Sequence, residues 1–215
     1  MQESSVPLAE IKRVAPSAIV IVVTNPLDVM AQVALEETGF PRERVIGMAG
    51  VLDTARYRSF IALELDVSIE DIQALVLGGH GDTMVPLASY TSVSGIPLTQ
   101  LLSQDRIDAL IERTRKGGGE IVSHLKTGSA YYAPAAAAVQ MAEAIVKNKR
   151  RILPCAAWLQ GEYGMRDLYL GVPCMLGESG IERVIEVELD GEERTALENS
   201  AEHVRSTVSA LKSLD

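Results

Sequence analysis

The chain has 215 residues, enough to bury one large core or two small ones. Its 29 acidic and 20 basic residues give a net charge of −9, which argues against a nucleic-acid partner, because binding a phosphate backbone requires excess positive charge. The longest apolar run near the start, residues 18–23, is too short to cross a bilayer. We therefore expect a globular protein that binds neither nucleic acid nor a membrane.

The two cysteines, Cys155 and Cys174, provide no disulfide framework. Residues 1–5 lack the basic and then apolar pattern of a secretion signal. We expect a cytoplasmic protein with reduced, packed thiols, and the two cysteines as neighbours across a hairpin. No cluster of His, Cys, Asp and Glu has the spacing of metal ligands, so no metal site is predicted.

The first third of the sequence alternates between helical and β patterns. Helices are expected at residues 5–14, 28–38 and 52–65, and strands at residues 18–23 and 45–47. The run at 18–23 is continuously apolar and β-branched, which is typical of a strand covered on both faces in a parallel sheet. This order of elements predicts an α/β fold containing the C-terminal half of a doubly wound, Rossmann-type parallel sheet.

The N-terminal half of such a sheet is absent from this sequence. No Gly-x-Gly-x-x-Gly follows a first strand, and no acidic residue ends a second one. A parallel sheet of two strands is poorly covered, so the strand at 18–23 should have an unpaired edge. We therefore expect a fragment of a longer fold.

The remaining residues predict an α+β domain. Helices are expected at residues 105–116, 133–146 and 192–214. Three glycines at 117–119 should bend or break the first of these before helical spacing resumes at residues 120–126. Strands at residues 152–159 and 168–176 flank a turn and predict an antiparallel hairpin, to which residues 181–189 add a third strand.

Two short segments carry the candidate chemistry. An apolar run at residues 72–77 predicts a strand that ends in a glycine-rich segment around His80, where missing side chains leave room for a small molecule. The second segment, upstream, supplies Asp53 and Arg56. A histidine exchanges protons near neutral pH, a neighbouring carboxylate raises its pKa, and an arginine binds a carboxylate through two hydrogen bonds. Asn25, after the first strand, could hydrogen-bond the reacting oxygen.

Together these residue types suit the reversible oxidation of a 2-hydroxy acid. A nicotinamide must then take the hydride, because no side chain accepts one. Each residue also has an ordinary structural explanation: a glycine turn around His80, a helix cap at Asp53, a surface cation at Arg56 and a turn at Asn25. The functional hypothesis depends on the set rather than on any one member.

Five segments, in this order, resemble the lactate/malate dehydrogenase family, and more closely the bacterial malate dehydrogenases built like lactate dehydrogenases. They are VVTNPLD at 22–28, VIG at 45–47, LDTARYR at 52–58, GGHGDTMVP at 78–86 and KTGSAYYAP at 126–134. The resemblance implies reversible NAD-dependent oxidation of (S)-malate to oxaloacetate, with lactate dehydrogenase as an alternative. Within the family, Gly79 and the run at 84–87 are more similar to malate than to lactate dehydrogenases.

The resemblance also implies roles for single residues. His80 would accept the proton during malate oxidation, with Asp53 as its partner, and Arg56 would bind the substrate carboxylate. Asn25 would contact both substrate and cofactor. The implied cofactor contacts are Val23, Thr24, Asn25 and Pro134.

Compared with the family, roughly the first third is missing, including the glycine fingerprint and a mobile loop with two further arginines. Residues 1–52 would be the remnant of the NAD-binding domain and residues 53–215 the catalytic domain. The resemblance implies a homo-oligomer, a dimer or a tetramer, but leaves the choice of NAD over NADP open. We expect a malate dehydrogenase that is inactive as this chain alone; the alternative is a non-catalytic fragment that retains only oligomer contacts.

Overall fold

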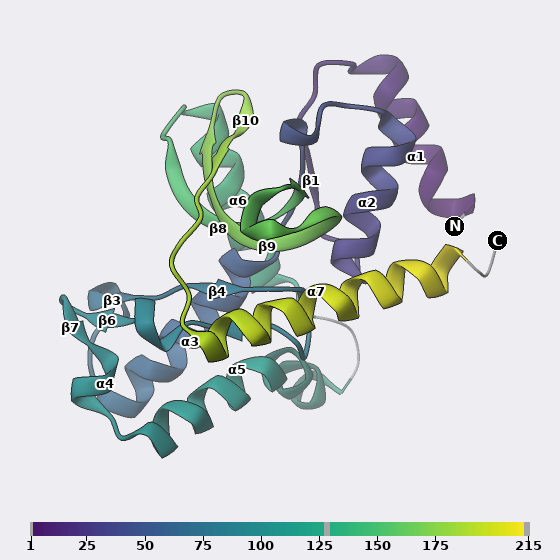
Figure 1. Cartoon of the computed structure of the whole chain (residues 1–215). Coiled ribbons are helices and arrows are strands. Elements are labelled where there is room, and N and C mark those ends of the chain that lie inside the picture. The colour runs from purple at the N-terminus through teal and green to yellow at the C-terminus, as the bar shows by residue number, and fades with distance from the viewer. Residues whose placement is uncertain (1, 127–129, 213–215) are drawn as a thin grey trace.

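A computed structural model describes residues 2–126 and 130–212. Its centre is a five-stranded sheet in the order β1-β2-β8-β9-β10 (Figure 1). The strands are β1 Val20–Val22, β2 Val45–Gly47, β8 Arg151–Gln160, β9 Arg166–Gly177 and β10 Gly180–Val184. β1 and β2 run parallel, whereas β2–β8, β8–β9 and β9–β10 are antiparallel pairs. The predicted parallel pair and the predicted hairpin therefore form one mixed sheet.

The two parts of this sheet join where Gly47 lies opposite Ala156. A Cβ atom on Gly47 would lie 2.7 Å from Ala156 Cβ and 2.7 Å from Leu27 Cδ2, so the join requires a glycine. At the other side of the parallel pair, β1 ends the sheet, and no strand of the described residues pairs with its free edge. The predicted unpaired edge is confirmed within that part of the chain.

Helices cover the sheet and extend away from it. They are α1 Gln2–Val14, α2 Leu27–Thr38, α3 Gly50–Leu65, α4 Leu98–Leu101, α5 Gln104–Leu125, α6 Tyr132–Val146 and α7 Gly191–Lys212. Short 3-10 turns occupy Arg42–Arg44, Ile69–Asp71, Ala88–Tyr90 and Glu162–Gly164. As predicted, α2 ends at Thr38, and its C-cap Gly39 has a left-handed φ of 62°. The predicted domain division after residue 52 falls inside α3 and stays a prediction.

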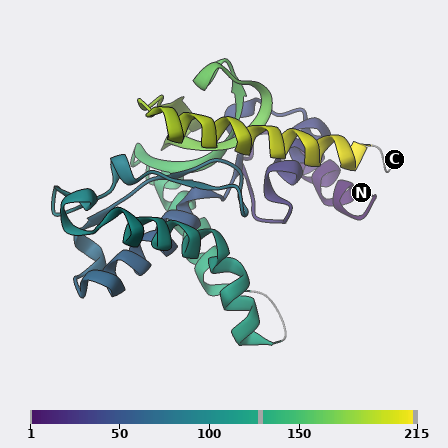
Figure 2. The same ribbon diagram turned by 60° about the horizontal axis from the view of Figure 1, so that its bottom comes forward.

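The long helix α7 lies below β9 in Figure 1, and in Figures 1 and 2 its C-terminal end is on the same side of the molecule as α1. Its buried side chains Leu197, Ala201 and Val204 join the main core, which also includes the hairpin, α3 and α6. In the described part of the chain, no helix has both the length and the apolar character that a bilayer crossing requires.

The run at residues 72–77 forms two strands in different sheets, so its prediction as one strand is wrong. β3 Ile72–Gln73 pairs with β6 Ser92–Val93, which in turn pairs with β7 Ile96–Pro97. β4 Val76–Leu77 pairs with β5 Val85–Pro86. The chain changes partners between β3 and β4, and there the Val76 N–H donates to Thr54 Oγ1 of α3 at 3.1 Å. An apolar pattern alone does not encode that change.

At residues 117–119, where the sequence predicts a bend or a break, α5 is not broken and continues as one helix from Gln104 to Leu125. Glycines in a helix interior cost about 1 kcal/mol each relative to alanine. Here two of them pack against α3: a Cβ on Gly117 would lie 3.4 Å from Arg56 Cδ, and one on Gly118 would lie 3.6 Å from Arg56 Nη1. Close packing on α3 therefore offsets the low helix propensity.

The hairpin β8–β9 is confirmed, and the third strand, β10, ends at Val184 rather than at residue 189. Cys155 and Cys174 are free and buried, as predicted. They are not directly opposed, however: Cys155 pairs with Val172, and Cys174 pairs with Leu153. The hairpin register, fixed at its turn, offsets the two cysteines by two positions.

Candidate active site

A cavity of about 710 Å³ lies beside the carboxyl end of β1. Five of the predicted site residues line it: Val23, Asn25, Arg56, His80 and Pro134. Asp53 lies behind this wall and is 1 % exposed. Thr24 is exposed and is not among the residues that line the cavity. Residues 127–129 of the fifth family-like segment lie outside the described residues.

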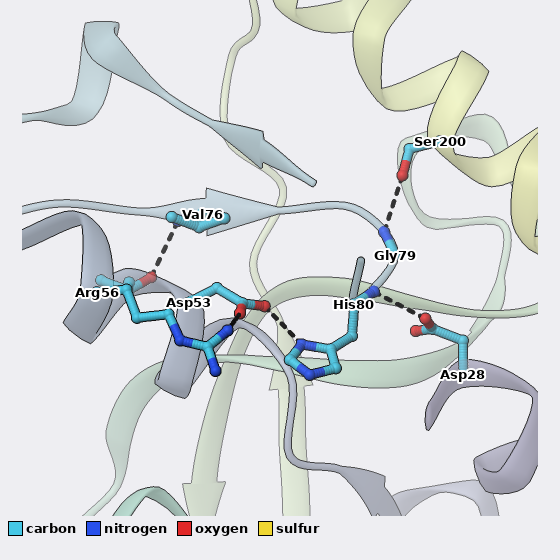
Figure 3. Close-up of polar contacts among 8 residues, drawn as sticks. Asp28, Asp53, Arg56, Val76, Gly79, His80 and Ser200 are labelled. Atoms are coloured by element: carbon cyan, nitrogen blue, oxygen red, sulfur yellow. Dashed lines mark hydrogen bonds and ion pairs between the residues drawn. The ribbon is translucent and has the colours of Figure 1, made fainter. Parts of the chain in front are cut away.

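The Asp53 carboxylate bridges the side chains of His80, its predicted catalytic partner, and Arg56, the predicted substrate-binding residue (Figure 3). Asp53 Oδ2 lies 2.8 Å from His80 Nδ1, and Oδ1 accepts a hydrogen bond from Arg56 Nη1 at 3.3 Å. Asp53 and Arg56 are three residues apart in α3, so they share one face of the helix. The His80 and Arg56 side chains are each 12 % exposed, which leaves both accessible from the cavity.

Glycines hold the His80 loop at the cavity wall. Gly78 follows β4 with a φ of 86° and exchanges two hydrogen bonds with Gly171 of β9, at 2.9 and 3.0 Å. A side chain on Gly171 would collide with the Gly78 carbonyl, so the loop can approach the sheet only because Gly171 lacks one. The loop that carries His80 is thereby anchored to the central hairpin.

Electrostatics around His80 favour its protonated form. Burial by itself would lower the pKa of His80, but the hydrogen bond to Asp53 and the charges of Asp53 and Asp28 together raise it above its usual 6.5. Arg56 has a smaller, opposing effect. The imidazole therefore keeps its proton to a higher pH than an unperturbed histidine does.

Sequence reasoning did not single out two residues that touch this loop. Asp28 Oδ2 accepts the His80 N–H at 2.8 Å, and Ser200 Oγ accepts the Gly79 N–H at 2.8 Å (Figure 3). An acidic residue in the first turn of a helix is ordinarily explained by the helix dipole, so Asp28 gave no distinct signal. Ser200 is 121 residues away from Gly79, and no local pattern could indicate their contact.

A second arginine in the cavity was also missed. Arg115 of α5 lines the wall, and its Nε donates to the Met84 carbonyl at 3.1 Å. The described residues contain no group of three or more His, Cys, Asp and Glu side chains that could hold a metal ion. The side chains at this wall can exchange a proton at His80 and bind an anion at the arginines.

Two models of one protein family match most of this chain. Residues 6–47 match the model of the lactate/malate dehydrogenase NAD-binding domain, and residues 50–214 match that of the family's α/β C-terminal domain. The malate dehydrogenase of Roseiflexus sp. (strain RS-1) is 60 % identical over 200 residues, which cover 93 % of this chain and 65 % of that protein. The chain thus spans about 65 % of the length of this curated relative.

Two solved structures have closely similar folds. The malate dehydrogenase from Salinibacter ruber superposes with a TM-score of 0.96 at 55 % identity, covering 99 % of this chain and 70 % of that one. The Cryptosporidium parvum lactate dehydrogenase, solved with lactic acid and nicotinamide adenine dinucleotide, gives 0.96 at 42 % identity, covering 98 % and 68 %. From its two domain matches and these relatives, the chain belongs to the lactate/malate dehydrogenase family.

Proposed function

We propose that this chain carries the catalytic site of an NAD-dependent malate dehydrogenase, which reversibly oxidises (S)-malate to oxaloacetate. The observation that carries the proposal is the Asp53 carboxylate, held between His80 and Arg56 at one cavity wall. A proton acceptor and a carboxylate anchor side by side are what a 2-hydroxy acid requires. The names of the Roseiflexus and Salinibacter proteins support malate as the substrate.

His80 moves the proton. Because Nδ1 of the neutral ring donates to Asp53, Nε2 keeps the free lone pair. During malate oxidation Nε2 takes the proton of the C2 hydroxyl while a hydride leaves C2, and during reduction the protonated ring returns that proton. Asp53 holds the ring in this tautomer and stabilises the imidazolium that forms.

Arg56 anchors the substrate. Its buried Nε has no hydrogen-bond partner among the described residues. Leaving a buried charged donor unpaired is costly, so a carboxylate bound against the guanidinium would satisfy it. Asn25 lines the same cavity and offers the reacting oxygen a neutral hydrogen-bond donor.

Bound NAD would supply the hydride acceptor, which no side chain can replace. The residues present suit a nicotinamide: Val23, Asn25 and Pro134 line the cavity that contains His80, next to the carboxyl end of β1. Ligands of open α/β sheets bind outside the carboxyl ends of the strands. We include Thr24, which follows Val23 at this end of β1, among the cofactor contacts.

We extend the proposal to the cellular compartment, the oligomeric state and the domain division of the protein. Free, buried cysteines suit the reducing cytoplasm. Val139, Val146 and Tyr132 of α6 are 66 %, 83 % and 88 % exposed, and such apolar exposure suits a homo-oligomer, a dimer or a tetramer. Residues 1–52 would belong to the NAD-binding domain and residues 53–215 to the catalytic domain.

The substrate is tested by steady-state kinetics of the natural gene product with NADH. We expect kcat/KM for oxaloacetate to exceed that for pyruvate by about 100-fold or more, since a site built for a second carboxylate rejects a substrate lacking it. NADPH replaces NADH in a parallel series. A preference for pyruvate would indicate a lactate dehydrogenase, and turnover of neither substrate would overturn the proposal. The 215-residue chain assayed alone should be inactive, because its sequence has no glycine-rich phosphate fingerprint.

The pH dependence follows from His80. Reduction requires the protonated ring, so kcat/KM for oxaloacetate should fall as the pH rises through the raised pKa of His80. Oxidation requires the neutral ring, so kcat/KM for malate should rise through the same pH range. Stopped-flow measurement of the chemical step in both directions checks this. Two flat profiles, with the chemical step rate-limiting, would remove the proton-transfer role from His80.

A further inference from the structure

Asp28 lies behind the catalytic loop, away from the main cavity. It belongs to the first turn of α2, is 7 % exposed, and accepts the backbone N–H of His80 at 2.8 Å. In Figure 3 its carboxylate reaches His80 from the side opposite to Asp53. The loop lies tightly against it, since a Cβ on Gly79 would lie 3.4 Å from Asp28 Oδ2 and 2.8 Å from Val204 Cγ2.

Burying the charged Asp28 carboxylate lowers the free energy of unfolding. Its second oxygen, Oδ1, is buried without a hydrogen-bond partner among the described residues. Burial raises the pKa of Asp28 from 3.8 to about 6, against the opposing effects of the His80 N–H and charge. A neighbouring cavity of about 100 Å³, lined by Asp28, Thr83, His203 and Thr207, has room for a water that could exchange the proton. Packing alone does not explain a buried acid with an unpaired oxygen.

We propose that Asp28 is a positioning residue for His80, which fixes the backbone of the catalytic loop from α2 and sets a second negative charge beside the imidazole. The proposal rests on the proposed role of His80 as the proton carrier. It gives the buried acid a function: the backbone hydrogen bond aligns the ring with Asp53, and the charge stabilises the imidazolium. α2 thereby joins α3 in controlling proton transfer.

Charged and titratable groups surround His80 from α2, α3, α5, α7 and its own loop. They are Asp53 and Arg56 of α3, Asp28 of α2, Asp82 of the loop itself, Arg115 of α5 and, across the cavity behind the loop, His203 of α7. Among these, the charges of Asp53 and Asp28 raise the pKa of His80, and that of Arg56 lowers it. Because Asp28 itself titrates near pH 6, the two groups are coupled, and protonating Asp28 weakens the hold of His80 on its proton.

The test is an NMR titration of the histidine ring signals in the 215-residue chain, with the His80 signal assigned by its loss in His80→Gln. Asp28→Asn keeps an oxygen for the His80 N–H but removes the charge, so we expect the pKa of His80 to fall by about 0.5 or more. Glu36→Gln removes the same charge two turns further along α2 and should shift it by less than about 0.2. In the wild type, the His80 signal should show a second inflection near pH 6 that Asp28→Asn abolishes.

Kinetics and unfolding give two further readouts. In the natural gene product, Asp28→Asn should lower kcat for oxaloacetate reduction by about 3- to 10-fold with KM unchanged within two-fold, and move the alkaline limb of the pH profile downward. Asp28→Ala, which also loses the hydrogen bond, should be slower still.

The raised pKa of Asp28 stabilises the fold below pH 4, and that contribution is lost as the pH rises through about 6. At pH 8, Asp28→Asn should therefore melt higher than the wild type.

An unchanged His80 titration in Asp28→Asn, an equal shift in Glu36→Gln, or a single-step titration in the wild type would each overturn the proposal. The titration requires no substrate or cofactor. A natural gene product that reduces no oxaloacetate would thus refute the proposed function, while the NMR result would still decide whether Asp28 controls His80.

Discussion

Replacing His80 by glutamine is expected to lower kcat in both directions by about 10²- to 10⁴-fold, with the KM for malate within a few-fold of the wild-type value. Glutamine can still donate and accept hydrogen bonds from this position but cannot carry a proton between the substrate and solvent. Steady-state kinetics of the natural gene product measure the loss. The residual rate should also lose the pH dependence that the titration of His80 gives the wild type.

The variant to compare with His80→Gln is Asp53→Asn, because Asp53 hydrogen-bonds the His80 ring. Asp53→Asn alone should slow the reaction less, because the imidazole remains but loses its oriented tautomer and part of its raised pKa. Residues that act as a unit are not additive, so the double variant should be about as slow as His80→Gln alone. If the two losses multiply instead, Asp53 acts independently of His80. If His80→Gln stays within three-fold of the wild type, His80 is not the proton carrier.

The part of the site that follows local patterns was predictable from the sequence. Asp53 and Arg56 lie on a helix that the sequence predicts, and their three-residue spacing places them on one face. His80 follows a short apolar run and two glycines, which indicates a chain segment ending at an open space. The hairpin and the strand at residues 45–47 likewise have strong local signals, and both are present in the structure.

The parts that depend on distant partners were not predictable. Asp28 and His80 are 52 residues apart, and the contact of Ser200 with Gly79 depends on where α7 crosses the molecule. The role of Gly47 was not predictable either. In the sequence it ends a short strand pattern, and only the structure shows that it lets β2 pair with the distant strand β8. α5 continues through its glycines because α3 lies against them. Residue patterns report preferences for a helix or a strand, whereas these features depend on which segments meet.

Replacing Arg56 by glutamine should lower kcat/KM for oxaloacetate by about 30- to 5,000-fold, which corresponds to about 2–5 kcal/mol for a desolvated charge pair that loses one partner. Its guanidinium is 12 % exposed, donates to Asp53, and keeps a buried Nε without a partner among the described residues. Arg56→Lys keeps the charge but not the planar fork, so it should recover only part of the loss.

Arg115→Gln is the matched control, since it removes the same charge from the same cavity. Arg115 is a third exposed and already donates its Nε to the Met84 carbonyl, so we expect a loss below about 10-fold. Removing Arg56 also raises the pKa of His80, because its charge lowers that pKa in the wild type. The variants must therefore be compared by kcat/KM on the acidic plateau of each pH profile, where His80 is protonated in all of them. A greater loss from Arg115→Gln than from Arg56→Gln under those conditions would transfer the carboxylate anchor from α3 to α5, while the proton chemistry of His80 and Asp53 would remain as proposed.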